Sequence, residues 1–351
     1  HFPLIFIRFI ILFRFLITPE FTNSFLRIES KNTKMSQTEE NVTPIFDLMM
    51  SQYHSSTLVI FGRLGLFDFI NNEGSDGVTV KQLAERANWS VRATSAMLIA
   101  LVTTGILERV PSGDNNGATT HSFEERYKLA PRSARFLLLD APGSVVAYLE
   151  LFWECSPQNL MEKASADKKQ DNFMLETGGG APSELFINAM DGQTSHAAMV
   201  LSPLLASHLG DASNDFVDVA GGSGTFCLEV CKALPKCNGT IYELASVCPV
   251  TEKFISKADL SDRVKAVAGD MFKDKVFPPA ECYGFGNVLH DWSDEDNTAL
   301  LQKAYDSLPE KSGKIAILEM LVAEDVVSTT GATAGLNLVM VTNEDGRQYK
   351  A

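Results

Sequence analysis

The chain has 351 residues, 45% of them hydrophobic and 21% charged, which is enough apolar material for two globular domains. The net charge of −14 and the sequence pI of about 4.9 argue against nucleic acid as a partner, because binding to phosphate backbones needs a basic surface. None of the six cysteines forms a Cys-x-x-Cys pair. We therefore expect free thiols in a reducing, cytoplasmic compartment, with neither a disulfide framework nor a metal site.

The first 34 residues differ in composition from the rest of the chain. Residues 2–17 are almost wholly apolar but include Arg8 and Arg14, and the stretch is short for a membrane span of about 20 residues. The segment also lacks the small-residue cleavage site of a signal peptide. We expect residues 1–34 to lie outside the fold and the protein to start at Met35, with a membrane anchor as the alternative.

Residues 35–136 show the pattern of a winged-helix domain, in which a helix-turn-helix is followed by a β-ribbon. Thr79 is a suitable N-cap for the first helix of the pair, and Gly105 closes the second. Pro44 fits the first turn of a preceding helix. The expected elements are helices over residues 44–70, 80–87 and 91–104, strands over 106–110 and 127–129, and a hairpin tip over 112–121.

A winged helix suggests DNA binding, and the alternative is a dimerisation module. The helix over residues 91–104 has a single charged residue, Arg92, whereas a DNA-reading helix needs polar side chains for the bases and cations for the phosphates. Its apolar residues are Ala96, Met97, Leu98, Ile99, Ala100, Leu101 and Val102. We therefore expect this helix to be buried and the domain to form a homodimer.

Residues 137–351 are predicted to form a second, α/β domain. Residues 142–206 are expected to be helical, with an interruption at the glycine-rich stretch 177–182. From residue 216 onward strands and helices alternate, which is typical of a Rossmann-like parallel sheet with helices on both faces. The expected strands cover residues 216–219, 240–244, 264–267, 282–289 and 314–319, and the helices cover residues 225–234, 249–258 and 294–308.

A glycine-rich stretch follows the first of these strands, in the sequence Asp218-Val219-Ala220-Gly221-Gly222-Ser223-Gly224. Glycines allow a tight turn and let the backbone approach a ligand closely, and ligands of open α/β sheets bind at the carboxyl ends of the strands. Glu243, at the end of the second strand, can accept hydrogen bonds from both hydroxyls of a ribose; the alternative is a solvated carboxylate. Because the G-x-G-x-x-G spacing is absent, S-adenosylmethionine fits better than NAD or FAD.

A second motif, Asn287-Val288-Leu289-His290-Asp291-Trp292-Ser293-Asp294-Glu295, lies at the end of the fourth strand. The carboxyl ends of parallel strands share one edge of the sheet, so His290 and Asp291 are expected on the same edge as the glycine-rich turn. A histidine has a pKa near ~6.5 and is suited to act as a general base at neutral pH. The alternative is a core histidine that serves packing alone. Together the two motifs predict a group-transfer enzyme.

These two motifs, with Gly269-Asp270-Met271-Phe272 between them, resemble the plant caffeic acid and acetylserotonin type O-methyltransferases, which use S-adenosylmethionine. The resemblance covers residues 43–351. It implies a class I methyltransferase sheet over residues 206–351, a helical region over 137–205 that walls the substrate site, and a winged-helix dimerisation domain over 35–136.

The resemblance also implies the residues of the site. The implied cofactor-binding residues are Asp218, Ala220, Gly221, Gly222, Gly224, Glu243, Asp270, Met271, Phe272 and Asn287. His290 is implied as the general base, with Asp291 and Glu319 beside it. Phe186, Met190 and Met340 are implied as walls of an aromatic substrate site.

The chain departs from the family pattern at four points. Ala220 replaces the first glycine of the family's loop, and Gly286 stands where the plant enzymes carry a cofactor-contacting lysine. Gln348 lies near the place of a late glutamate of the family site. The chain stops at Ala351, before the family's last two strands, so we expect a fragment that lacks the terminal antiparallel hairpin.

The motifs and the resemblance together predict transfer of a methyl group from S-adenosylmethionine to a hydroxyl of a small phenolic or hydroxyindole acceptor. A phenol has a pKa near ~10, so its oxygen needs a base at neutral pH. One alternative is a winged-helix regulator that senses S-adenosylmethionine, which the acidity and the apolar helix disfavour. The other is an NAD-dependent oxidoreductase, which the missing G-x-G-x-x-G disfavours. The expected partners are the acceptor and a second copy of the chain, with no membrane unless residues 1–34 form an anchor.

Overall fold

The computed structural model describes residues 43–110, 125–151, 184–209, 215–309, 313–323 and 346–350. The first 34 residues, the expected hairpin tip at 112–121, the glycine-rich stretch 177–182 and Met340 lie outside these residues. The chain divides into two compact units, with the division after Glu154. Within the described stretches, no helix is both long enough and apolar enough to cross a membrane.

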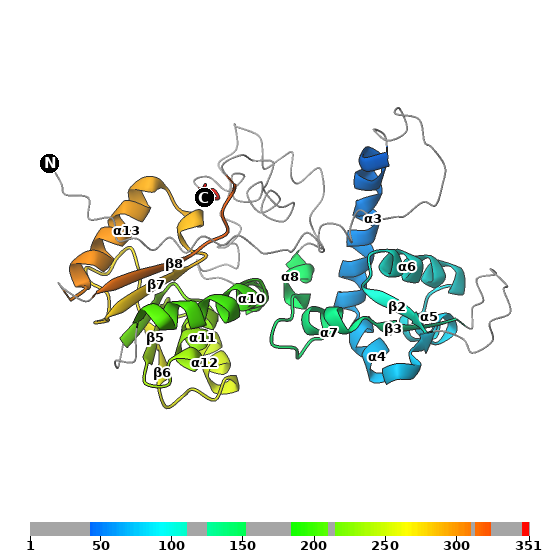
Figure 1. Ribbon diagram of the computed structural model, residues 1–351, viewed down its shortest axis with the longest axis horizontal. Helices are drawn as coiled ribbons and strands as arrows, with labels where there is room; N and C mark the ends of the chain where they lie inside the picture. The colour runs from blue at the N-terminus through cyan, green and yellow to red at the C-terminus, as the bar shows by residue number, and fades with distance from the viewer. Residues whose placement is uncertain are drawn as a thin grey trace. The chain divides into compact units, whose positions relative to one another are not determined.

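The N-terminal unit contains the expected helix-turn-helix and β-ribbon (Figure 1). Its elements are α3 (Thr43–Arg63), α4 (Leu66–Asn72), η1 (Gly74–Asp76), β1 (Val78–Thr79), α5 (Val80–Ala87), α6 (Val91–Thr103), β2 (Leu107–Val110), β3 (Arg126–Leu129), α7 (Pro131–Leu137) and α8 (Val146–Leu151). β3 pairs antiparallel with both β1 and β2. Thr79 and Gln82 form a capping box at the start of α5, because each side chain accepts a hydrogen bond from the backbone N–H of the other.

The helix expected over residues 44–70 is broken into α3 and α4 at Gly65, whose φ of 62° lies in the left-handed region. The prediction of one helix was wrong because the apolar stripe continues across a glycine that ends one helix and redirects the chain. The redirection lets Phe67 and Ile70 of α4 pack into the same core as Phe61 of α3.

The N-terminal unit extends beyond the domain boundary expected after residue 136. A Cβ atom on Gly62 of α3 would lie 3.3 Å from Leu149 Cδ1 of α8, so these two helices are in close contact. Leu137 and Leu149 belong to the core of this unit. Residues 137–205 are the region expected to wall the substrate site. Helix α8 lies within this range but packs in the N-terminal unit.

Helix α6 divides its apolar residues between the core and the surface. Leu98 and Leu101 are buried, whereas Ala96 is exposed and Ile99 keeps 38% of its accessible surface. The N-terminal unit thus buries one side of α6 and leaves apolar residues of the other side at its surface, and burial of that other side in a dimer stays a prediction.

The C-terminal unit is built on five parallel strands in the order β6-β5-β4-β7-β8, which confirms the predicted α/β fold. Its elements are α10 (Glu184–Leu209), β4 (Asp215–Val219), α11 (Thr225–Ala233), β5 (Asn238–Glu243), α12 (Cys248–Lys257), β6 (Val264–Ala268), β7 (Cys282–Gly286), η3 (Leu289–Asp291), α13 (Asp294–Ser307) and β8 (Lys314–Leu318). Figure 1 shows α13 on one side of this sheet and α10, α11 and α12 on the other.

Alternation of side chains along the strands explains these two layers of helices. Phe216 and Ile241 face the side on which α10, α11 and α12 supply the core. Their neighbours Val217 and Tyr242 face the opposite side and pack with α13. The sheet is thus buried on both faces, which leaves its edges and strand ends as the accessible places for a ligand.

β4 pairs with β5 on one side and with β7 on the other, so the strand order changes direction between β4 and β7. The carboxyl ends of these two strands therefore flank the topological switch point, where open α/β sheets bind ligands. The strand expected over residues 282–289 is shorter than predicted and ends at Gly286. Asn287 has a φ of 55°, and a residue in this left-handed conformation cannot continue a strand. His290 therefore lies in the 3₁₀ turn η3 rather than on the strand itself.

Residues 346–350 lie against the turn that carries His290. The Arg347 N–H donates to the His290 carbonyl at 2.7 Å. The Val322 N–H, beyond β8, donates to the Tyr349 carbonyl at 2.8 Å, and Val322 and Lys350 form an isolated parallel bridge. The segment expected to lead toward a terminal hairpin is thus hydrogen-bonded to the candidate site.

Candidate active site

The glycine turn (residues 220–224) connects β4 to α11 at the carboxyl edge of the sheet. Ala220, Gly222 and Gly224 have φ values of 54°, 56° and 80°. The Ala220 N–H donates to the Tyr242 carbonyl at 2.9 Å, which fixes the start of the turn to β5. Three left-handed residues within five reverse the chain tightly, and Ala220 takes up this conformation although it is not glycine.

The glycines of this turn have different surroundings. A Cβ atom on Gly221 would lie 2.8 Å from the Asp218 carboxyl group, and one on Gly224 would collide with Ile241 Cδ1. A Cβ atom on Gly222 would meet no described atom within 4 Å. Gly222 is therefore the point at which the backbone of the turn faces space that a ligand can fill.

Glu243 lies beside this open space at the end of β5. Its Oε1 accepts a hydrogen bond from the Gly222 N–H at 3.2 Å, and its Oε2 accepts one from the Leu244 N–H at 2.5 Å. Burial raises the pKa of Glu243, and the two backbone hydrogen bonds oppose that rise. Each carboxylate oxygen keeps a further lone pair, so the group can still accept hydrogen bonds from ribose hydroxyls.

Asp218 is buried below the glycine turn, with 1% of its surface exposed. Its Oδ2 accepts a hydrogen bond from the Cys227 N–H at 3.1 Å, which ties the first turn of α11 to β4. Burial raises the pKa of Asp218 to about 7; the Cys227 hydrogen bond lowers it and the charge of Glu243 raises it. These contacts support a role in holding the turn in shape, and direct contact of Asp218 with a cofactor stays a prediction.

Asp270, Met271 and Phe272 lie in the loop after β6. Asp270 Oδ1 accepts hydrogen bonds from the Phe272 and Lys273 N–H groups at 3.0 and 3.2 Å, and the Lys273 ammonium lowers the Asp270 pKa. Phe272 is 42% exposed and meets Trp292 edge-on, with ring centroids 4.6 Å apart. The structure thus brings this loop next to the turn that carries His290.

Helix α10 is tied to the same edge at two points. The Thr225 hydroxyl, at the start of α11, donates to Asp191 Oδ1, and Asn287 Nδ2 donates to Thr194 Oγ1 at 3.0 Å. Met190 lies one helical turn before Thr194 and is half-buried, as is Phe186 one turn earlier. Two of the three predicted substrate-wall residues therefore lie on a helix that is attached to the site.

His290 is held by carboxylates on both sides of its ring and is 5% exposed. Its Nδ1 lies 2.6 Å from Glu319 Oε2, and its backbone N–H donates to Glu319 Oε1 at 3.3 Å. Because a carboxylate only accepts hydrogen bonds, Nδ1 carries a hydrogen, and in the neutral ring Nε2 is therefore the nitrogen with the lone pair. Nε2 lies 3.5 Å from Asp291 Oδ1.

The environment of His290 favours its protonated form. Burial by itself lowers the pKa of the imidazole, but the hydrogen bond and charge of Glu319, together with the charge of Asp291, raise it to about 8. Burial also raises the pKa of Asp291, to about 6, although His290 lowers it. The His290 pKa lies above its ordinary 6.5, so its contribution to stability is present below that pH and is lost as the pH rises through about 8.

Four polar residues that hydrogen-bond to the loops of the candidate site were not predicted from the sequence. Asp191 and Thr194 could have been found, because they follow Met190 on the same helix. Asn297 and Tyr349 had no signal in the sequence, since their contacts with the His290 turn come from α13 and from the C-terminal segment.

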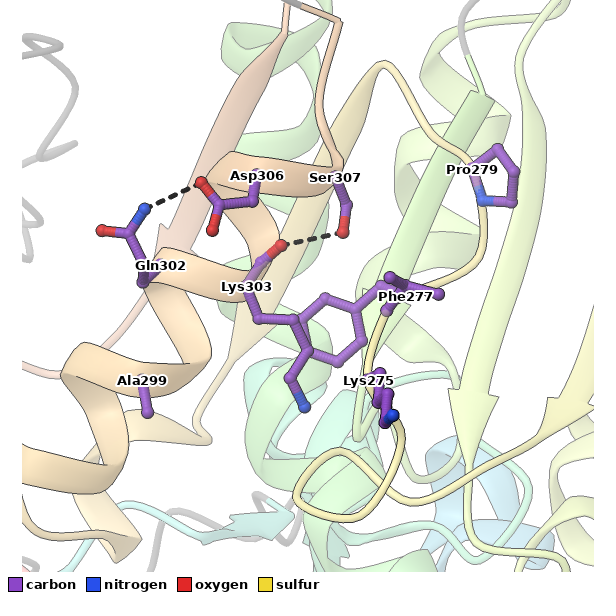
Figure 2. Close-up of a pocket in the computed structure, with 9 residues that line it drawn as sticks. Lys275, Phe277, Pro279, Ala299, Gln302, Lys303, Asp306 and Ser307 are labelled. Atoms are coloured by element: carbon purple, nitrogen blue, oxygen red, sulfur yellow. Dashed lines mark hydrogen bonds between the residues drawn. The ribbon is translucent and has the colours of Figure 1, made fainter.

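A groove of about 540 Å³ lies away from this edge, between the loop before β7 and α13 (Figure 2). Pro279 precedes β7 and Ser307 ends α13, so the groove lies toward the amino ends of the strands, opposite to where open α/β sheets bind ligands. Lys303 in this groove donates to the carbonyls of Met271 and Asp274 at 2.5 and 2.6 Å. The groove is therefore not the candidate site, but Lys303 supports the loop that carries Met271.

Comparison with known proteins shows two family profiles along the chain. An O-methyltransferase dimerisation domain matches residues 46–138, and an O-methyltransferase domain matches residues 178–351. Together these matches cover most of the N-terminal unit, without α8, and the sheet with its glycine turn and His290.

Individual relatives and solved structures agree with these profiles. The chain is 23% identical over 316 residues to a 3-hydroxy-5-methyl-1-naphthoate 3-O-methyltransferase of Streptomyces sahachiroi, covering 88% of this chain and 85% of that protein. It is 28% identical over 283 residues to a strychnine O-methyltransferase of Strychnos nux-vomica, covering 74% and 73%. A crystal structure of human N-acetylserotonin methyltransferase in complex with S-adenosylmethionine has a TM-score of 0.69 at 21% identity, covering 91% and 90% of the chains, and shows the same fold.

Replacing Glu319 with glutamine should lower the His290 pKa below about 8, because the amide keeps an acceptor but removes the charge that stabilises the imidazolium. NMR titration of the histidine ring signals measures this shift. Asp306→Asn, an exposed carboxylate on α13, is the control and should leave the titration unchanged. A His290 pKa that stays at about 8 in Glu319→Gln would contradict the role of Glu319 in stabilising the imidazolium.

Proposed function

The chain belongs to the S-adenosylmethionine-dependent O-methyltransferases that carry an N-terminal dimerisation domain, and we propose that it methylates a small phenolic or hydroxyindole acceptor with His290 as the general base. The observation that carries the proposal is the 2.6 Å contact of His290 Nδ1 with Glu319. This contact leaves Nε2 as the proton acceptor at the edge of the sheet that holds the glycine turn.

The residues at the carboxyl edge fit the cofactor. Gly222 faces open space beside Glu243, whose carboxylate is oriented by two backbone N–H groups. The Asp270 to Phe272 loop places an apolar, partly exposed ring beside the base turn (residues 288–292), where it suits a flat purine. When bound, S-adenosylmethionine supplies an activated methyl group on a sulfonium. Glu243 would hold the ribose, and the buried carboxylates of this edge favour a cationic ligand.

The proposed role of His290 follows from its two nitrogens. Neutral Nε2 takes the proton of the acceptor hydroxyl, so that the oxygen becomes nucleophilic as it attacks. Nδ1–H stays on Glu319, which keeps the ring oriented and stabilises the imidazolium that forms. Asp291 lies 3.5 Å from Nε2 and adds a second negative charge beside the imidazolium. His290 is therefore the group that removes the proton, and the two carboxylates act through it.

The class of acceptor is supported by the helix that lies beside the site. Phe186 and Met190 present half-buried, apolar side chains on α10, and pockets lined by such residues suit flat aromatic molecules. The Streptomyces relative is named for a hydroxynaphthoate, an aromatic hydroxyl compound. We therefore propose a small aromatic acceptor for this chain as well.

Binding of S-adenosylmethionine should depend on Glu243 and Gly222. Glu243→Ala should weaken binding by about 10- to 100-fold, because hydrogen bonds to a charged group contribute about 1.5–3 kcal/mol. Gly222→Leu should abolish binding, since its side chain would occupy the open space. Isothermal titration measures both, with NAD as a second ligand.

A matched control is Glu229→Ala, which removes a half-buried carboxylate on α11 that pairs with Lys232. Its affinity for S-adenosylmethionine should equal that of the wild type. Unchanged cofactor affinity in both site variants would refute the assignment of the glycine turn and Glu243, and binding of NAD in preference would favour an oxidoreductase.

His290→Ala should leave cofactor affinity nearly intact and lower turnover by about 10²–10⁴-fold, the usual contribution of a positioned base. Turnover of the wild type should rise with pH through about 8, because His290 must be neutral to accept a proton. The loss of turnover in His290→Ala should become smaller as the pH rises toward the pKa of the acceptor hydroxyl, because the phenolate then forms without a base. Labelled S-adenosylmethionine with a panel of simple phenols and hydroxyindoles measures these rates.

Asp291→Asn and Glu319→Gln are the comparison variants and should cost less than His290→Ala, since these residues orient and stabilise rather than take the proton. Normal turnover of His290→Ala at neutral pH would mean that another group is the base.

The N-terminal unit should form a homodimer. Leu48 and Tyr53 of α3 are 74% and 62% exposed, and Ile99 of α6 is 38% exposed, which leaves apolar surface for a partner. Light scattering at micromolar concentration should give twice the mass of the chain, and Leu48→Asp should shift it toward the monomer. Val276→Asp, an equally exposed apolar position in the other unit, should leave the mass unchanged. A monomeric wild-type protein would count against this proposal.

A further inference from the structure

We propose that Asn297 and Tyr349 are positioning residues that clamp the base turn and thereby aim His290; the inference rests on the proposed role of His290. Asn297 belongs to α13 and Tyr349 to the C-terminal segment, so the clamp joins two parts of the chain that lie far apart in sequence. Neither residue belongs to the motifs that identify the site.

Asn297 is the centre of the clamp. Its Nδ2 lies 2.7 Å from the Leu289 carbonyl oxygen, 3.1 Å from the Trp292 carbonyl oxygen and 2.7 Å from the Tyr349 hydroxyl. The side chain is buried, with 5% of the residue exposed. One amide group thus holds the base turn from both sides of His290.

Tyr349 closes the clamp from the C-terminal segment. Its hydroxyl donates to the Leu289 carbonyl at 3.2 Å. Two backbone contacts bring it there: the Arg347 N–H donates to the His290 carbonyl at 2.7 Å, and the Val322 N–H donates to the Tyr349 carbonyl at 2.8 Å. The segment is therefore bonded both to the base turn and to the chain beyond β8.

The base turn needs such support because regular structure does not provide it. Asn287 ends β7 in a left-handed conformation, and η3 is a single turn of three residues. Within the turn, the Asp291 N–H donates to the Val288 carbonyl at 3.2 Å and the Trp292 N–H donates to the Leu289 carbonyl at 3.3 Å, so the His290 and Trp292 carbonyls need donors from outside it. The Arg347 N–H and Asn297 supply these donors, Asn297 and Tyr349 also contact the Leu289 carbonyl, and Glu319 accepts from the His290 N–H.

Neither clamp side chain is hydrogen-bonded to the imidazole of His290, so both act through the backbone. Glu319 holds Nδ1 at 2.6 Å, and that distance depends on where the base turn lies relative to β8. A displacement of about 1 Å in a catalytic group can cost about 10²-fold in rate. Loss of the clamp should therefore lower turnover and loosen the contact between His290 and Glu319, without changing the glycine turn.

The test uses Asn297→Ala, Asn297→Asp and Tyr349→Phe in the full chain. Aspartate has the shape of asparagine but offers no hydrogen to the carbonyls, so it should fail as alanine does. We expect turnover to fall by about 10- to 100-fold in the Asn297 variants and about 10-fold in Tyr349→Phe, with affinity for S-adenosylmethionine within about twofold of wild type. Matched controls on α13 are Gln302→Ala and Tyr305→Phe, which alter exposed side chains and should change neither quantity.

A second readout does not depend on turnover. NMR titration should show the His290 pKa falling from about 8 toward its ordinary value of 6.5 in Asn297→Ala and Tyr349→Phe, which add no charge, because the imidazolium loses part of its contact with Glu319 and Asp291. If His290→Ala kept normal turnover, the proposed base would be wrong, yet this titration would still report on the clamp. Folded Asn297 and Tyr349 variants with unchanged turnover and an unchanged His290 titration would overturn the inference. If Asn297→Ala failed to fold, Tyr349→Phe, which removes a single oxygen, would decide alone.

Discussion

The contact between His290 Nδ1 and Glu319 Oε2, at 2.6 Å, is the interaction on which the rest of the site depends. It joins residues that follow two neighbouring strands, β7 and β8, and both side chains are almost completely shielded from water. Breaking a buried ionic contact leaves an uncompensated group, so the two strand ends must keep this geometry. The base turn then has one place to lie, and through Trp292 it also locates the Phe272 ring of the neighbouring loop.

Carboxylates that accept backbone hydrogen bonds shape the loops along this edge of the sheet. Glu243, Asp218, Asp270 and Glu319 each accept hydrogen bonds from backbone N–H groups of an adjacent turn. Such bonds replace the strand pairing that stops at the end of each strand, and they help to orient the loops. Because these groups are carboxylates, they also make the edge acidic, which suits a cofactor that carries a positive charge.

Helix α10 connects the two halves of the proposed site. Its contacts with Thr225 and Asn287 reach the start of α11 and the end of β7, which flank the topological switch point. The helix that presents Phe186 and Met190 is thereby held relative to both the glycine turn and the base turn. The proposed substrate wall, cofactor turn and base are thus parts of one hydrogen-bonded framework rather than separate loops, which favours a rigid alignment of the reacting groups.

Local patterns in the sequence determined the order and type of most elements, the parallel α/β fold, and the motifs around Gly222 and His290. These follow from side-chain alternation, from the capping chemistry of Thr79 and Ser293, and from the backbone freedom of glycine, all of which act between near neighbours. The same reasoning failed at Gly65 and Asn287, where a single left-handed residue ends an element whose apolar pattern continues. Only the tertiary structure decided that Asn297 and Tyr349 would meet at the base turn, because hydrogen bonds between distant segments depend on how helices and strand ends pack.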